Sequence, residues 1–202
     1  TPNKESGGYD GKKGSGNAHI NKNRDRQHGR IYRIKYEMTE ETDNLPNAEG
    51  GEKLVNLLSH DNLFWRITAQ RLLVEKNYLE TIPLLEKLVL KGDVSSIHAI
   101  WALHGLGQLS YETHNIALTS NSPDLRRNAI RALGTDHQSA QMLYDSAVLA
   151  DKNPQVRLVA FSKLALHDHN NERGKIASLL MEQPQNNEDE WIVIALKASG
   201  AK

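Results

Sequence analysis

The sequence predicts an all-α fold in which residues 50–202 form an α-solenoid of about five helical hairpins. Three observations support this prediction. From about Gly50 onward, apolar residues recur at the helical period of about 3.6 residues. One sequence motif occurs five times within the same region. The composition, with 38% apolar and 5% aromatic residues, suits a thin layered structure better than a thick sandwich or a barrel.

A basic, polar tail over residues 1–36 precedes the predicted helices. Residues 1–29 are rich in Gly, Lys, Asn, Ser and Arg, a composition that predicts disorder for this segment taken alone. Residues 30–36 alternate Ile and Tyr with basic residues and predict one short strand. A strand needs a partner, and no later segment offers one, so we expect its sheet to be encoded upstream of Thr1. Residues 37–49 are acidic, contain a proline and predict a linker.

The recurring motif consists of a polar turn, a large apolar residue, often a basic residue, and then a small residue followed by Leu. Its five copies lie at residues 61–69, 96–103, 122–129, 153–160 and 190–195. The matched positions are Ala69, Trp101, Ala129, Ala160 and Ala195, which are 32, 28, 31 and 35 residues apart. This spacing is typical of one helical hairpin per repeat. A small residue there allows two helices to approach closely, and we expect smaller neighbours to accommodate Trp101.

An amphipathic segment before each copy predicts the first helix of each pair. These segments are Glu52–Leu58, Tyr78–Leu90, Tyr111–Leu118, Ala140–Leu149 and Lys175–Met181. The second helices are predicted to begin at the N-caps Asp61, Ser122 and Asn153, whose side-chain oxygens accept from free backbone amides. Pro123 and Pro154 follow at the first helical position, where a missing N–H is tolerated.

Arginine follows the large apolar residue in three copies, as Arg66, Arg126 and Arg157. An aspartate lies a few residues before each of them: the three are Asp61, Asp124 and Asp151. This pattern favours a ladder of Asp–Arg contacts between neighbouring hairpins over a row of ligand-binding arginines.

The three tryptophans, Trp65, Trp101 and Trp191, fall at or beside core-facing positions of the second helices, so we expect them to pack rather than to stack on a ligand. The run Trp191–Ile194 is apolar on more than one face. It therefore resembles an internal repeat more than a polar cap, and we expect further helices after Lys202.

Charge is unevenly distributed along the chain. Residues 1–36 hold nine Lys/Arg and three Asp/Glu, whereas residues 37–202 hold sixteen and twenty-two. A net negative helical region disfavours binding to phosphate backbones, because nucleic-acid binding by a helical repeat, as in helical-repeat glycosylases, needs a basic concave stripe. We therefore expect protein partners and no nucleic acid. No apolar run reaches the roughly 18–20 residues of a membrane span, and no signal peptide opens the chain.

No catalytic or metal-binding constellation is predicted. The chain has no cysteine, which excludes disulfides, thiolate zinc sites and covalent haem attachment within it. His167 and His169 lie in a predicted solvated turn, and His98 and His104 are six residues apart on one helix, which places them on different faces. No nucleophile-elbow motif and no Gly-rich phosphate loop after a strand occurs.

Two sets of residues carry a resemblance to known proteins. The motif Asn153-Pro154-x-Val156-Arg157-x-x-Ala160 resembles HEAT repeats. Residues 57–73 (LLSHDNLFWRITAQRLL) and 98–107 (HAIWALHGLG) look like the helical middle of large secreted bacterial proteins, the membrane-bound dehydrogenase or haem-binding proteins of planctomycetes and related phyla. Residues 23–34 (NRDRQHGRIYRI) are similar to the segment that ends the β-propeller of that family.

The resemblance implies a longer parent protein that is secreted or periplasmic. In that family a propeller similar to sugar dehydrogenases precedes the helices, and a c-type cytochrome module often follows them, so haem c or a quinone cofactor is expected in the parent and none in this chain. The leading hypothesis is a non-catalytic interaction and spacer module that contacts domains of the same parent or another protein. The alternative is a quinone-dependent sugar or alcohol dehydrogenase whose propeller site is completed by residues 24–34, with His28, Arg30 and Tyr32 at its mouth.

Overall fold

The computed structural model describes residues 9–10, 15–16, 49–167 and 171–202. The chain divides into two compact units, Thr1–Asp43 and Asn44–Lys202. In the first unit β1 (Tyr9–Asp10) pairs antiparallel with β2 (Ser15–Gly16). The predicted strand at 30–36 and all but the last residue of the predicted linker lie outside the described residues.

The described part of the second unit is helical, which confirms the all-α prediction. Its helices are α1 (Gly51–Leu57), α2 (Leu63–Glu75), α3 (Ile82–Val89), α4 (Val94–Gly105), α5 (Tyr111–Leu118), α6 (Pro123–Ala132), α7 (His137–Asp145), α8 (Pro154–Leu164), α9 (Asn171–Met181), α10 (Pro184–Asn187) and α11 (Glu190–Ala198). Short 3-10 turns occupy Leu79–Thr81 and Ala147–Ala150.

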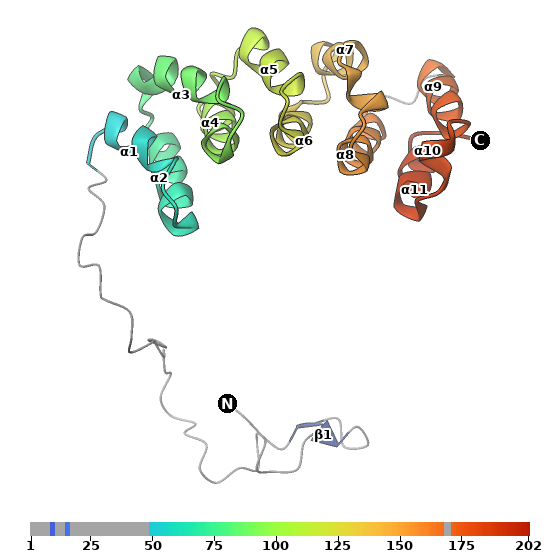
Figure 1. Cartoon of the computed structure of the whole chain (residues 1–202), viewed down its shortest axis with the longest axis horizontal. Coiled ribbons are helices and arrows are strands. Elements are labelled where there is room, and N and C mark those ends of the chain that lie inside the picture. Colours follow the sequence, from blue (N-terminus) through green and yellow to red (C-terminus); the bar gives the residue numbers. More distant parts are fainter. Residues whose placement is uncertain (1–8, 11–14, 17–48, 168–170) are drawn as a thin grey trace. The chain divides into compact units, whose positions relative to one another are not determined.

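The helices of this unit lie in two rows (Figure 1). Helices α3, α5, α7 and α9 form an outer row, and α2, α4, α6, α8 and α11 form an inner row. Successive inner helices pack against each other, and each also packs against a helix that precedes it: α1 for α2, and α3, α5, α7 and α9 for α4, α6, α8 and α11. The buried Leu, Ile, Val and Ala side chains between the rows form one continuous apolar cluster. Burial of this cluster is the main stabilising contribution, since few of these helices are long enough to be stable alone.

The predicted first helices agree with the structure at three of five positions and differ at two. The segment Ala140–Leu149 is not one helix, because Ser146 adopts an extended backbone and separates α7 from the 3-10 turn that follows. The segment Tyr78–Leu90 likewise begins with a 3-10 turn, and α3 starts after it with a proline in its first turn. Helix α7 begins earlier than predicted because Asp136 caps it.

The predicted N-caps are confirmed at Ser122 and Asn153 and wrong at Asp61. Asn62 caps α2 instead, and its Oδ1 accepts from the backbone N–H of Phe64 at 2.9 Å. Both residues are good caps in principle, and the helix begins one residue later than the sequence pattern indicated. Pro123 and Pro154 occupy the first position of their helices, as predicted.

Small side chains lie where inner helices meet their neighbours. Ala69, Ala129 and Ala160 each stand seven residues after the N-cap of their helix and are fully buried. Ala195 stands six residues after its cap, Asp189, and is also buried. In α4 the cap is Asp93, which puts the buried Ile100, and not the half-buried Trp101, at the seventh position.

Candidate interaction surface on the inner helices

Three arginines of the inner row hold the turn that precedes their own helix. Arg66, Arg126 and Arg157 each donate from Nη1 to a backbone carbonyl six residues earlier, at 2.6, 2.7 and 2.8 Å. The acceptors are the carbonyls of His60, Ser120 and Asp151. These turn carbonyls would otherwise need water, so the arginine side chain takes the place of solvent there.

The remaining nitrogens of each guanidinium reach the next hairpin. Arg126 donates to both carboxylate oxygens of Asp151, at 2.6 and 2.8 Å. Arg157 donates from Nε to Asn186 Oδ1 at 2.8 Å and from Nη2 to the Gln185 carbonyl at 2.9 Å. Each arginine therefore ties the start of its own helix to the following repeat.

The first of these links has a histidine as its acceptor. Arg66 Nε donates to Nε2 of His98 on α4 at 3.3 Å. The other ring nitrogen, Nδ1, lies 2.8 Å from Gln70 Oε1, so the ring is neutral and carries its proton on Nδ1. Burial, and then the positive charge of Arg66, lower the pKa of His98.

The second and third hairpins are joined in a different way. Trp101 on α4 donates its indole N–H to Asn128 Oδ1 on α6 at 2.9 Å. The predicted Asp–Arg ladder is therefore correct only at the Arg126–Asp151 pair. Asp61 contributes its backbone carbonyl to Arg66, and Asp124 lies 3.3 Å from the neighbouring Arg127.

The Arg126–Asp151 pair is the strongest of these links electrostatically. Burial by itself raises the pKa of Asp151, but the hydrogen bonds from Arg126 and from the Asn153 backbone, with the charges of Arg126 and Arg157, outweigh it and lower the pKa overall. The carboxylate is thus ionised at neutral pH. A bidentate, charge-assisted contact of this kind restricts the relative position of the two hairpins.

The inner helices share a stripe of exposed and half-buried residues, defined here as the second, fifth and ninth residues after the N-cap of each helix. In α4 the corresponding residues come one position earlier. Helix α6 packs against α4, α8 and the outer helix α5, so its exposed residues face away from the outer row. We call this set the inner stripe: Phe64, Ile67, Arg71, Val94, Ile97, Trp101, Asp124, Arg127, Arg131, Gln155, Leu158, Ser162, Trp191, Ile194 and Ala198.

The inner stripe is apolar at both ends and charged in the middle. Phe64 and Trp191 are 62% and 67% exposed, and Ile67 and Ile194 lie one turn further along the same helices. Helix α6 carries Arg127 and Arg131 at the centre. Exposed aromatic and aliphatic residues repeated on one face are typical of protein-binding surfaces.

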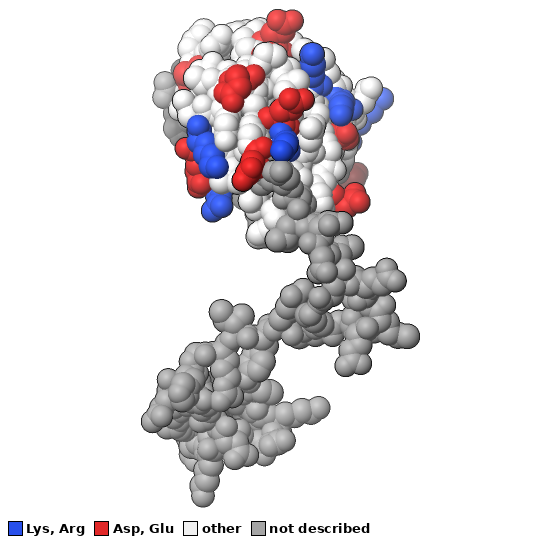
Figure 2. Space-filling model, turned by 90° about the vertical axis from the view of Figure 1, so that its left-hand side faces the viewer, with Lys and Arg blue, Asp and Glu red and all other residues white. Residues whose placement is uncertain are grey.

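The end of the second unit that lies beyond α1 and α2 shows no comparable charge pattern. In Figure 2 acidic and basic side chains alternate there with uncharged surface, and neither sign forms a large patch. The two helices that form this end are α1 and α2, which pack against each other. This surface offers no strong field for a highly charged ligand.

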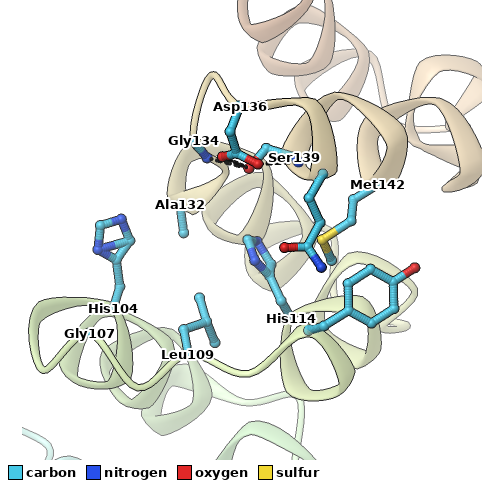
Figure 3. A pocket seen from close by; sticks show the side chains of 11 residues that line it. His104, Gly107, Leu109, His114, Ala132, Gly134, Asp136, Ser139 and Met142 are labelled. Carbon is cyan, nitrogen blue, oxygen red and sulfur yellow. Dashed lines mark hydrogen bonds between the residues drawn. The ribbon is translucent and has the colours of Figure 1, made fainter.

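A small cavity of about 270 Å³ lies between the ends of α4 and α6 and the starts of α5 and α7 (Figure 3). His104 from α4, His114 from α5, and Asp136 and Ser139 from the start of α7 line it. The Ser139 hydroxyl donates to Asp136 Oδ2 at 2.7 Å, and His114 Nε2 donates to the Ala129 carbonyl at 2.8 Å.

These contacts stabilise helix ends and turns. Asp136 is the N-cap of α7, and its hydrogen bonds from the Ser139 side chain and backbone lower its pKa. Burial lowers the pKa of His114, which keeps the ring neutral. Because the Ser139 hydroxyl already donates to a carboxylate, it is not arranged for activation by a histidine. Residues 49–167 and 171–202 hold no group of three His, Asp or Glu side chains arranged for a metal ion.

The structure places the remaining predicted site residues as follows. Trp65 and Trp101 are half-buried, but the packing prediction is wrong at Trp191, which stands on the inner stripe. His167 is buried, contrary to the predicted solvated turn. His28, Arg30, Tyr32 and His169 lie outside the described residues.

The sequence pattern alone does not reveal the inner stripe. The stripe residues recur at fixed positions counted from the N-cap of each inner helix, and this recurrence can be recognised only when the N-caps are known.

Comparison of the sequence with protein-family models and with curated proteins gave no match. Within the described residues, no helix is both long and apolar enough to cross a membrane.

Proposed function

We propose that residues 50–202 form a HEAT-type α-solenoid that acts as a non-catalytic protein-interaction and spacer module. The observation that carries this proposal is the combination of an inner row linked from hairpin to hairpin with an exposed inner stripe along it. The links supply stiffness and the stripe supplies a contact surface. Repeat arrays of this kind present extended binding surfaces, because each repeat adds a similar face beside the last.

The spacer role rests on the contacts between hairpins. Each of the four junctions carries at least one side-chain hydrogen bond in addition to apolar packing, from Arg66, Trp101, Arg126 and Arg157 respectively. Directional bonds at every junction disfavour sliding or splaying of neighbouring hairpins. An array stiffened in this way would hold whatever is attached at its two ends at a fixed separation.

The larger setting is proposed from the sequence resemblance alone. In this proposal the chain belongs to a secreted or periplasmic parent of the dehydrogenase or haem-binding type, and residues 24–34 complete its propeller. Haem c or a quinone cofactor would then be bound by other parts of the parent. The residues present here do not fit thioether attachment of haem, because the chain has no cysteine.

The absence of cysteine also makes a direct test simple, since one introduced cysteine becomes a unique labelling site. We would prepare the full chain with Gln155→Cys on the inner stripe and, as a matched control, Glu112→Cys on the outer helix α5. Both positions are exposed. Each variant is labelled with a benzophenone maleimide and irradiated in an extract of the source cells.

The proposal predicts protein adducts from position 155 that position 112 does not give, identified by mass spectrometry. Identical adducts from both positions, or none from either, would contradict an interaction role for the inner face. Circular dichroism spectra of both labelled variants check that the helices are retained.

A further inference from the structure

The centre of the inner stripe holds a locally basic site within a net acidic region. Arg127 and Arg131 stand one helical turn apart on the exposed side of α6. Residues 37–202 as a whole contain twenty-two Asp/Glu against sixteen Lys/Arg. The only inner-stripe carboxylate in the described part of the chain is Asp124, on the same helix.

The hydrogen-bonding capacity of these two arginines is largely unused. Asp124 Oδ1 lies 3.3 Å from Arg127 Nη1, and the aspartate side chain is 67% exposed, so this pair is weak. Arg127 Nε is buried and has no hydrogen-bond partner. The Arg127 side chain is 30% exposed overall, so a peptide carboxylate that reaches its accessible Nη atoms would form a charge-assisted contact with the guanidinium.

Half-buried apolar side chains flank the basic pair on both sides. Ile97 and Trp101 lie on α4, and Leu158 lies on α8. The hydrogen bond from Trp101 to Asn128 fixes the orientation of the indole, so its exposed part is a preformed contact surface. The basic residues on α6 therefore lie between apolar residues on α4 and α8. A ligand with acidic residues between apolar residues has the matching arrangement.

We propose that this part of the inner stripe binds an acidic peptide segment with apolar flanking residues. The inference rests on the proposed interaction role and adds the chemistry of the partner. The peptide carboxylates pair with Arg127 and Arg131, and an apolar side chain packs against Trp101. Helix axes are about 8–10 Å apart, so three helices span on the order of 20 Å, which about six extended residues cover.

The other inner-stripe positions favour a peptide over a nucleic acid. A phosphate backbone is bound by rows of cations, whereas the ends of this stripe are the apolar residues Phe64, Ile67, Trp191 and Ile194. The one additional cation of the stripe, Arg71, lies 3.8 Å from Glu75 on the same helix. Two available guanidinium groups suffice for a few carboxylates but not for a strand of phosphates.

The test is a titration of the full chain against a fluorescein-labelled peptide in which a run of glutamates is flanked by leucine and phenylalanine, followed by fluorescence anisotropy. The variant Arg127→Gln/Arg131→Gln should weaken binding about tenfold or more, as expected for the loss of two charge-assisted hydrogen bonds. The matched control Lys53→Gln/Lys175→Gln removes the same charge at exposed positions of α1 and α9 and should leave the affinity within about twofold.

Two further probes identify the class of ligand. A peptide with glutamine in place of glutamate should bind at least about tenfold more weakly, by the same reasoning. A single-stranded oligothymidylate of equal charge should not compete. Tighter binding of the oligonucleotide would show a nucleic-acid site and overturn the proposal.

The remaining outcomes also decide the matter. Absence of saturable peptide binding, or equal weakening by the arginine and lysine variants, contradicts the acidic-peptide site. If cross-links from position 155 are found in either of these cases, the interaction role stands and only the partner chemistry is wrong. If the cross-links are absent as well, both proposals fail.

Discussion

Arg126 on α6 and Asp151 in the turn before α8 form a bidentate ion pair between the third and fourth hairpins, with N–O distances of 2.6 and 2.8 Å. The two side chains are only 16% and 7% exposed. The same carboxylate accepts from the backbone N–H of Asn153, the N-cap of α8, at 2.8 Å. One aspartate thus connects a neighbouring hairpin to the start of the next inner helix.

Removal of this carboxylate should strongly destabilise the protein. The variant Asp151→Ala leaves the guanidinium of Arg126 largely buried without a counter-charge, which costs about 3 kcal/mol of unfolding free energy. Urea unfolding followed by circular dichroism measures the loss. Asp124→Ala, which breaks the exposed pair with Arg127, serves as the control and should cost less than about 1 kcal/mol. Equal losses would show that the buried pair contributes no more than a surface pair.

Acidification should destabilise the protein through its buried histidines. Burial lowers the pKa values of His98, His114 and His167. The unfolded chain therefore binds more protons than the native state as the pH falls below about 6.5, so stability is complete above that pH and decreases below it, until the folded pKa is passed. The slope is at most about 1.4 kcal/mol per pH unit for each histidine.

His98 gives this pH dependence a specific structural cause. Its Nε2 accepts from Arg66, so a proton there places two donors against each other and breaks the link between the first and second hairpins. The variant His98→Gln should have a smaller difference in unfolding free energy between pH 7.5 and pH 5 than the wild-type chain. An unchanged difference would mean that His98 does not titrate in this range.

Overfilling a helix contact should lower the melting temperature. Ala129 is fully buried on α6, so Ala129→Leu forces side chains or backbone to shift and should cost about 1–3 kcal/mol. Ser162→Leu also introduces a leucine, but at an exposed position of α8, and should change stability by less than about 0.5 kcal/mol. Thermal unfolding of both variants tests the prediction, and similar melting temperatures would argue against close packing at Ala129.

The N-cap of α2 can be assigned by a pair of neighbouring substitutions. Asn62→Ala removes the oxygen that accepts from Phe64 and should cost about 1 kcal/mol. Asp61→Ala should cost less, because Asp61 contributes its backbone carbonyl, which the substitution retains, to Arg66. A larger loss from Asp61→Ala in urea unfolding would instead support the cap that the sequence suggested.

The sequence allowed prediction of the features that depend on local pattern. The helical period gave the all-α class, and Ser122-Pro123 and Asn153-Pro154 gave two helix starts, because a capping residue followed by proline is a strong combined signal. At Asp61-Asn62 two adjacent residues both suit a cap, and the choice between them depends on the course of the preceding turn. The break at Ser146 had no proline or glycine to mark it.

The candidate site depended on contacts that local pattern does not contain. The acceptors of Arg66 and Arg157 are backbone carbonyls, a histidine and an asparagine, and only the three-dimensional course of the turns brings them together. Exposure of Trp191 likewise depends on what packs beside α11, which the helical period does not reveal. Arg127 and Arg131 can be read directly from the sequence. Their position at the centre of the inner stripe follows from the packing of α4 and α8 against α6, which the sequence does not show.

The interaction role of the inner stripe is tested most directly by comparing photo-cross-links from Gln155→Cys on the stripe with those from Glu112→Cys on α5. If the inner stripe is the interaction surface, position 155 captures a protein that position 112 does not. Equal capture from both faces, or capture from α5 alone, would contradict the assignment of the inner row as the interaction surface.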